Sequence, residues 1–179
     1  MSTVSPEQLA TPRYCQVCGS PLTERYFEYE SRTRLQCESC GFVHYLNPRV
    51  VAAVIIENRG RVLLQRRAME PGVGLWTFPG GFLEIGERPE EGAVREAKEE
   101  VGLDVELAGL HGVYSRPHVG IVLVVYAGTS ASDDAVVGDY ESTEVAWFAA
   151  DAIPWDELAF DTTRAALEDW IRLRDGHAH

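Results

Sequence analysis

Hydrophobic and polar residues follow patterns that predict strands through the middle of the chain and helices at three places. Residues 50–58 (VVAAVIIEN) form an apolar run too continuous for a surface strand, which indicates a strand buried on both faces. Further strands are expected over 61–67, 103–116, 119–128 and 144–150, with a short extended segment over 74–81. Helices are expected over 89–101, 153–158 and 162–173. This mixture predicts an α/β layered fold.

The segment 79–103 combines a glycine-rich turn with a helix that carries acidic residues on one face. Pro89 stands where a helix can begin, and Gly102 is typical of a C-terminal stop. Glu96, Glu99 and Glu100 stand at positions i, i+3 and i+4, so their carboxylates share one face and repel one another. A divalent cation that prefers oxygen ligands, Mg²⁺ or Mn²⁺, would convert this repulsion into binding. A solvated acidic face is the alternative, because glutamate is a strong helix former.

The spacing in this segment resembles the signature of the Nudix hydrolases. Gly81 is followed after five residues by Glu87, and after seven more by residues 95–103 (REAKEEVGL), which fill every specified position of that signature. The resemblance implies a Nudix-type α/β/α sandwich with a mixed sheet. It also implies hydrolysis of the pyrophosphate bond of a nucleoside diphosphate linked to another group, by attack of water on phosphorus.

The same resemblance implies roles for individual residues. Divalent ions would neutralise the phosphate oxygens, orient the diphosphate and lower the pKa of the attacking water. The implied ligands of Mg²⁺ or Mn²⁺ are Glu96, Glu99 and Glu100, with the carbonyl group of Gly81 and the carboxylate of Glu87 as additions. Arg95 would orient the neighbouring carboxylates through charge-assisted hydrogen bonds.

Members of this family often take the general base from a loop after the signature helix. Glu141 and Glu144, in the segment 138–148 (GDYESTEVAWF), are the candidates. We prefer Glu141, which would have to approach the attacking water within about 3 Å, directly or through one more water. A solvated loop carboxylate is the alternative interpretation of each.

All four cysteines lie in two C-x2-C pairs, Cys15/Cys18 and Cys37/Cys40. This pattern is typical of a four-thiolate zinc site, and because no ligand position is open, the zinc is expected to be structural. Disulfides are the alternative, but no secretory leader precedes the pairs, so a cytoplasmic location with reduced thiols is expected. We expect a disordered tail over 1–12, a zinc ribbon over 13–46 and a Nudix hydrolase domain over 47–179.

Charge and hydropathy limit the partners. The net charge of −12 disfavours nucleic acids and anionic membranes, and no run of eighteen apolar residues is present to span a bilayer. A zinc ribbon could bind nucleic acid, but its four arginines are balanced by four glutamates. Its aromatic residues Tyr26, Phe27 and Tyr29 are expected to fill a small core. The ribbon could also support a homodimer, and the oligomeric state stays open.

An anionic nucleotide substrate needs local positive charge in so acidic a chain. Metal ions would supply most of it. The arginines that could add to it, if they line the pocket, are Arg49, Arg66, Arg67 and Arg116.

Two subgroups of the family carry a ribbon before the signature. NADH pyrophosphatases show a Trp-Pro-Phe-Pro motif downstream, where this chain has residues 114–128 (YSRPHVGIVLVVYAG). The other subgroup is similar to ADP-ribose or FAD pyrophosphatases and shares segments like HYLNPRV, LWTFPGG and IPWDELAF with this chain. We therefore expect hydrolysis of ADP-ribose or FAD with release of AMP. NADH pyrophosphatase and a nucleic-acid-binding ribbon are the alternatives, with mRNA decapping and removal of oxidised nucleotides more distant.

Overall fold

The computed structural model describes residues 11–138 and 140–176 of the 179-residue chain. The chain divides into two compact units, Met1–Asn47 and Pro48–His179. Of the tail expected over 1–12, residues 1–10 lie outside the described part of the chain. The two units are considered separately.

The first unit is a small antiparallel sheet with two cysteine turns. Its strands, in the spatial order β1-β2-β3, are β1 (Leu22–Phe27), β2 (Arg32–Cys37) and β3 (Val43–His44). Gly19 and Gly41 follow the second cysteine of each pair with φ of 75° and 78°, so each turn closes where only glycine adopts the backbone easily. Tyr26 and Tyr29 are 59% and 78% exposed, so the expectation that they fill a core is wrong. A metal-stabilised ribbon this small does not need such a core.

The second unit is built on a seven-stranded mixed sheet. The path through it is β10-β5-β4-β9-β8, with β6 paired to β5 and β7 paired to β4. Only the pair β4 and β9 is parallel among these strand pairs of the described chain. The strands are β4 (Arg49–Asn58), β5 (Arg61–Arg67), β6 (Trp76–Thr77), β7 (Gly80–Phe82), β8 (Glu106–Arg116), β9 (Ile121–Thr129) and β10 (Ser142–Ala149).

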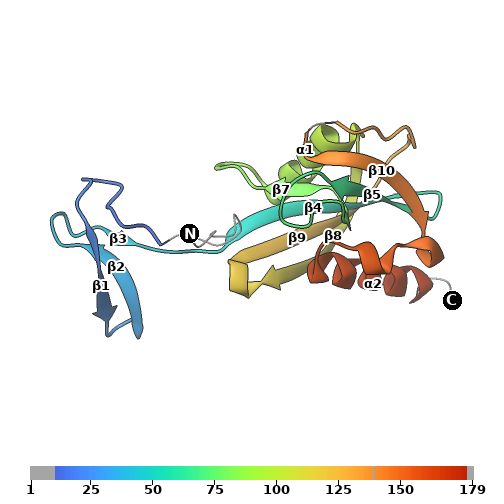
Figure 1. The fold of residues 1–179 in the computed structure, drawn as a ribbon. Coiled ribbons are helices and arrows are strands. Elements are labelled where there is room, and N and C mark those ends of the chain that lie inside the picture. The colour runs from blue at the N-terminus through green and yellow to red at the C-terminus, as the bar shows by residue number, and fades with distance from the viewer. Residues whose placement is uncertain (1–10, 139, 177–179) are drawn as a thin grey trace. The chain divides into compact units, whose positions relative to one another are not determined.

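Helices cover both faces of this sheet, as Figure 1 shows. The helix α1 (Pro89–Val101) packs on one face and α2 (Asp161–Gly176) on the other. Successive residues of β4 alternate between the two resulting cores: Ala52 and Val54 lie with α1, whereas Ala53 and Ile55 lie with α2. The expected α/β/α sandwich, with a central strand buried on both faces, is confirmed.

One expected helix is wrong. Residues 153–158 contain only a 3-10 turn, Trp155–Glu157, which follows the 3-10 turns Pro117–Val119 and Ala150–Ala152 along the chain. Ile153 is extended with ψ of 129°, as expected before Pro154, whose ring disfavours a helical residue at that position. Ile153, the apolar residue at the start of the segment, is 4% exposed and packs in the core with α2.

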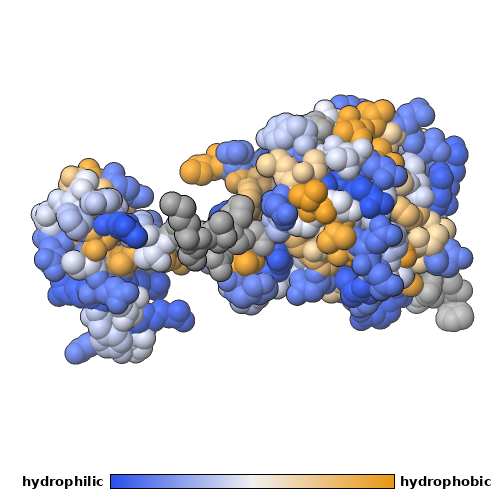
Figure 2. All heavy atoms as spheres, viewed as in Figure 1, coloured by the Kyte–Doolittle hydropathy of each residue, from blue (hydrophilic) through white to orange (hydrophobic). Residues whose placement is uncertain are grey.

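Hydrophilic residues cover most of the face drawn in Figure 2, and apolar residues reach it in scattered groups. Across the described chain, none of the helices combines the length and hydropathy needed to cross a bilayer.

Candidate active site and zinc site

The helix α1 is bounded by the residues that its sequence predicts. Pro89 is its first residue, and Glu91 reaches back to accept a hydrogen bond from the backbone N–H of Arg88 at 3.1 Å. Gly102 closes the other end in the left-handed conformation, with φ of 71°. One side of the helix is anchored by Ala93 and Ala97, which are fully buried. The helix is therefore packed against the sheet through this buried side.

The glycine turn before the helix contacts two of the three helical glutamates. The backbone N–H of Gly80 donates to a carboxylate oxygen of Glu100 at 2.7 Å, and Glu100 is only 3% exposed. A Cβ atom on Gly81 would collide with the carboxylate of Glu96. Both glycines lie in β7, paired with Ala53 and Ala52 of β4. The absence of side chains in this turn is what lets the acidic face of α1 reach the turn's backbone.

Arg95 donates hydrogen bonds to three carboxylates of this segment. Its guanidinium group donates to Glu87 at 2.7 and 3.0 Å, to Glu96 at 2.7 Å and to Glu99 at 2.9 Å. The hydrogen bonds from Arg95 to Glu87 are the main reason that the pKa of Glu87 is lowered to about 2, and a hydrogen bond from the backbone N–H of Glu84 lowers it further. Glu87 is therefore ionised throughout the physiological range. The contacts are those that the orienting role of Arg95 requires.

Glu96 lies at the centre of this acidic cluster. Its side chain is 13% exposed, whereas that of Glu99 is 55% exposed. Burial raises the pKa of Glu96, and the charges of Glu99 and Glu141 add to the rise, against the opposing effect of Arg95. A divalent cation would relieve both the burial cost and the repulsion at this carboxylate.

The structure thus places all five expected oxygen donors around the turn and α1, but does not converge them on one point. Among the described residues, the cysteines are the one group of three or more ligating side chains whose ligand atoms lie within 4.8 Å of one another. The carboxylates are instead held by Arg95 and by the N–H of Gly80. Because every donor is an oxygen, the set fits a hard cation such as Mg²⁺ or Mn²⁺.

The two candidates for the general base have different surroundings. Glu144 is bound to Arg66 at 2.9 Å, and Arg66 also pairs with Glu157 at 3.2 Å. Glu141 is exposed, its carbonyl oxygen accepts a hydrogen bond from Ala68 at 2.7 Å, and its charge acts on Glu96. Glu144 is therefore directed to Arg66, whereas the negative charge of Glu141 acts on the acidic cluster through Glu96.

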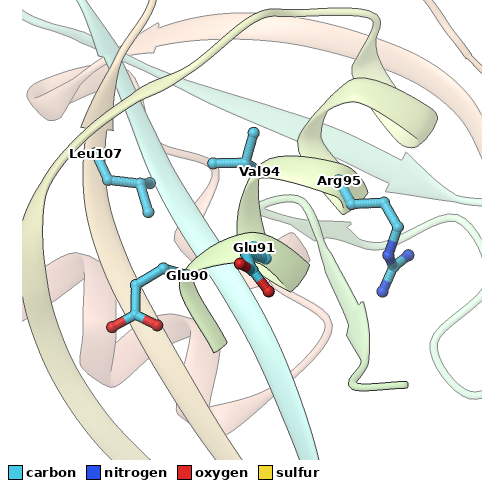
Figure 3. A pocket seen from close by; sticks show the side chains of 5 residues that line it. All are labelled: Glu90, Glu91, Val94, Arg95 and Leu107. Carbon is cyan, nitrogen blue, oxygen red and sulfur yellow. The ribbon is translucent and has the colours of Figure 1, made fainter. Parts of the chain in front are cut away.

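A shallow hollow of about 480 Å³ lies beside the acidic cluster. Its lining side chains come from α1 and from β8 (Figure 3), and they are Glu90, Glu91, Val94, Arg95 and Leu107. Arg95 belongs to both the hollow and the carboxylate cluster, so the hollow borders the candidate active site.

The four cysteines of the first unit form a compact sulfur cluster. Cys15 and Cys40 have their sulfur atoms 3.6 Å apart, and those of Cys18 and Cys37 are 3.5 Å apart. A disulfide requires about 2.05 Å, whereas tetrahedral zinc with sulfur ligands at about 2.3 Å places neighbouring sulfur atoms about 3.8 Å apart. The donor set therefore fits zinc, with Cys15 and Cys37 buried and the other two exposed.

The sequence did not point to the aromatic partners of the arginines. The guanidinium carbon of Arg66 lies 4.4 Å from the ring centre of Trp76, and the same guanidinium group pairs with Glu144 and Glu157. Arg49 contacts the ring of Phe82, and Arg67 and Arg116 contact that of Phe160. Phe160 is the last residue of the segment IPWDELAF, just before α2, but the segment does not indicate which arginines lie beside the ring. Those neighbours depend on how α2 packs on the sheet.

Comparisons with known proteins agree with this geometry. A family model described as the NUDIX domain matches residues 46–171, and one described as Nudix N-terminal, a zinc ribbon, matches residues 13–46. A crystal structure of a NUDIX hydrolase from Nitrosomonas europaea superposes with a TM-score of 0.87 and 35% identity, covering 94% of each chain.

Two relatives carry more specific names. An ADP-ribose pyrophosphatase of Methanocaldococcus jannaschii is 35% identical over 136 residues, which are 74% of this chain and 78% of that protein. A NAD-capped RNA hydrolase NudC of Stutzerimonas stutzeri is 29% identical over 92% of this chain, which spans only 58% of that relative's length. Together with the site geometry, these matches show that the chain belongs to the Nudix hydrolase family, whose members are pyrophosphatases.

Proposed function

We propose that this enzyme hydrolyses the pyrophosphate bond of ADP-ribose or FAD, with release of AMP, in a reaction that depends on Mg²⁺ or Mn²⁺. The observation that carries the proposal is the contact of Gly80 with the buried carboxylate of Glu100 and of Gly81 with the half-buried carboxylate of Glu96, which is also bound to Arg95. The relative named ADP-ribose pyrophosphatase supports the choice of substrate, because this chain covers 78% of it at 35% identity.

In this proposal the divalent ions are held by oxygen atoms of the turn and the helix. The donors are the carboxylates of Glu87, Glu96, Glu99 and Glu100 and the carbonyl group of Gly81. When bound, such ions neutralise the phosphate oxygens and align the diphosphate for in-line displacement. Arg95 orients three of these carboxylates through its hydrogen bonds.

Glu141 is the proposed general base. Its carboxylate accepts a proton from the attacking water as the oxygen of that water bonds to phosphorus. The bond between phosphorus and the bridging oxygen then breaks, so that ADP-ribose yields AMP and ribose 5-phosphate. The charge of Glu141 adds to the rise in the pKa of Glu96, which supports this assignment.

A second candidate substrate is a NAD-type dinucleotide, free as NADH or at the end of an RNA. It is supported by five relatives named NAD-capped RNA hydrolase, whose similarity of 25 to 29% identity extends over 92 to 93% of this chain and so includes the ribbon. The chain spans 58% of these relatives. The bond broken would be the same, so the same residues would act.

The test is a substrate panel with a paired variant. Purified protein is incubated with Mg²⁺ or Mn²⁺ and ADP-ribose, FAD, NADH, nucleoside triphosphates or NAD-capped RNA. The released AMP is measured, or, for the capped RNA, the released nicotinamide mononucleotide. Fastest turnover of ADP-ribose or FAD supports the proposal; fastest turnover of NADH or capped RNA replaces the substrate. Turnover of none of the panel rejects it.

Glu100→Gln is the matching variant. It keeps an oxygen that can accept from the N–H of Gly80, so folding is expected to be preserved. We expect turnover to fall at least about a hundredfold, a size typical for loss of an electrostatic group in an active site. Glu168→Gln, an exposed position of α2, is the control. Near-normal turnover of Glu100→Gln would reject its role as a metal ligand.

A further inference from the structure

Three arginines contact two phenylalanine rings: Arg49 contacts Phe82, and both Arg67 and Arg116 contact Phe160. Arg49 in β4 and Arg116 in β8 are both register partners of Ile121 in β9, so they flank it on the same face. Two strand spacings separate their Cα atoms by about 10 Å. Ala53 and Ile55 of β4, an even number of residues from Arg49, pack in the core with α2, which identifies the face. We call Arg49, Arg67 and Arg116 the arginine cluster.

Aromatic rings hold these guanidinium groups in place. Arg49 lies 4.5 Å from the ring centre of Phe82 and Arg116 lies 4.6 Å from that of Phe160. Arg67 contacts the same Phe160 ring at 5.1 Å and donates to the carbonyl group of Pro71 at 2.8 Å, so it also has a local structural role. Stacking on an aromatic ring fixes the plane of a guanidinium group. The N–H groups lie at the edge of that plane and therefore point away from the ring.

The arginine cluster adjoins the candidate active site at two points. Phe82 directly follows Gly81 in β7, and its carbonyl oxygen accepts a hydrogen bond from Arg95 at 3.3 Å. Arg67 directly precedes Ala68, whose N–H binds the backbone of Glu141. The residues that hold the arginine cluster are therefore direct chain neighbours of residues of the candidate active site.

The electrostatics favour an anion at this place. Arg49 and Arg116 carry like charges on one face of the sheet, two strands apart, and Arg116 is only 16% exposed, with Asp161 4.0 Å away and itself 77% exposed. In a chain of net charge −12, the arginine cluster is a local region of positive charge.

We propose that Arg49 and Arg116 bind a phosphate group of the nucleotide substrate, and that Phe160 positions Arg116 for this contact. The inference rests on the proposed function for the identity of the substrate. Arginine suits this role because its planar group binds two phosphate oxygens at once. The carboxylates then hold the divalent ions at the phosphoric anhydride bond that is broken, and the two arginines bind a phosphate group of the same substrate.

The experiment compares Arg116→Ala with Arg61→Ala. Arg61 is a matched control, since it too lies over an aromatic ring, Trp147 at 5.7 Å, and pairs with an aspartate, Asp133 at 3.3 Å, but it occupies the opposite end of β5 from the active site. We expect Arg116→Ala to raise KM for ADP-ribose about tenfold or more, with kcat changed much less, and Arg61→Ala to change neither. An unchanged KM for Arg116→Ala would overturn the inference.

Conservative variants separate binding from folding. If Arg116→Ala does not fold, as judged by circular dichroism, Arg116→Lys replaces it; this variant keeps the charge, and a raised KM still supports the bidentate contact. Phe160→Leu should raise KM in the same way and add little to Arg116→Ala, whereas Phe160→Tyr should keep a normal KM because it retains the ring. Additive effects of Phe160→Leu and Arg116→Ala would overturn the positioning role.

A binding measurement separates this inference from the proposed function. Calorimetry with α,β-methylene-ADP, a nucleoside diphosphate that is not hydrolysed, needs no turnover. Wild-type protein inactive on the whole substrate panel would reject the proposed function, while weaker binding of this probe by Arg116→Ala than by Arg61→Ala would still support the arginine contact. Equal binding by the two variants would overturn it.

Discussion

At the scale of single residues, two glutamates three positions apart have different surroundings. Ser142 pairs with Arg67 and Glu144 with Arg66, so the register of β10 against β5 shifts between them. Glu144 lies on the strand, bound to Arg66, while Glu141 precedes the strand and acts on Glu96. Strand pairing holds Glu144 beside Arg66, whereas Glu141 lies before the first paired residue of β10, and the spacing of the two carboxylates along the sequence does not reveal this.

The pair gives a matched prediction. Glu141→Gln is expected to lower kcat about a hundredfold or more, the range typical for loss of a general base, because glutamine cannot accept the proton. Glu144→Gln should change kcat less than threefold, since its carboxylate serves an exposed ion pair. Initial rates at saturating substrate and Mg²⁺ make the comparison, and equal effects of the two variants would contradict the assignment of the base.

The three helical glutamates also differ more than their common spacing suggests. A shared face predicts that all of them project into a cleft, yet Glu100 is buried against Gly80 while Glu99 is largely exposed. The difference arises because the turn of β7 passes over one part of that face. Residue spacing therefore identified the candidate donors, and packing decided how each of them is held.

At the scale of elements, the segment after β9 is tied to the end of α1. The N–H groups of Val136 and Gly138 donate to the carbonyl oxygens of Val101 and Glu100 at 3.1 and 2.9 Å. These are carbonyl groups of the last helical turn, which lack partners within the helix. The segment has no regular secondary structure, so these bonds connect the helix of the acidic residues with the segment that leads to Glu141.

Gly138→Ala tests this connection. A Cβ atom at this position would collide with the backbone carbonyl of Glu99, which cannot move as a flexible side chain can. We expect a loss of about 1 to 3 kcal/mol in the free energy of unfolding, together with reduced turnover because Glu141 is displaced. Gly176→Ala is the control, since nothing lies within 4 Å of its added atom.

Urea unfolding and kinetics on both glycine variants make the measurement. If Gly138→Ala were as stable and as active as Gly176→Ala, the docked segment would not contribute to the site.

At the scale of the whole molecule, the two compact units can be observed separately. All four tryptophans of the chain, Trp76, Trp147, Trp155 and Trp170, belong to the second unit, whereas the proposed zinc ligands belong to the first. Tryptophan fluorescence therefore reports on the hydrolase unit alone.

We expect about one zinc per chain by elemental analysis, and we expect its removal by a chelator to unfold the ribbon only, because the second unit has its own two hydrophobic cores. The midpoint of thermal unfolding measured by tryptophan fluorescence should shift by less than about 3 °C. A fully folded ribbon without metal, seen by NMR, would contradict the zinc site; a large shift of the tryptophan transition would contradict independent units.

The sequence alone determined the features that depend on neighbours along the chain. The bounds of α1, the buried strand β4, the cysteine turns and the positions of the acidic residues follow from local periodicity, glycine and proline placement and residue spacing. The tertiary structure alone decided which carboxylate is buried, which of Glu141 and Glu144 is bound to Arg66, and which arginines lie beside Phe160 and Phe82. Those outcomes depend on strand order, register and helix packing, which bring together residues as distant as Arg49 and Arg116, and no local pattern encodes such contacts.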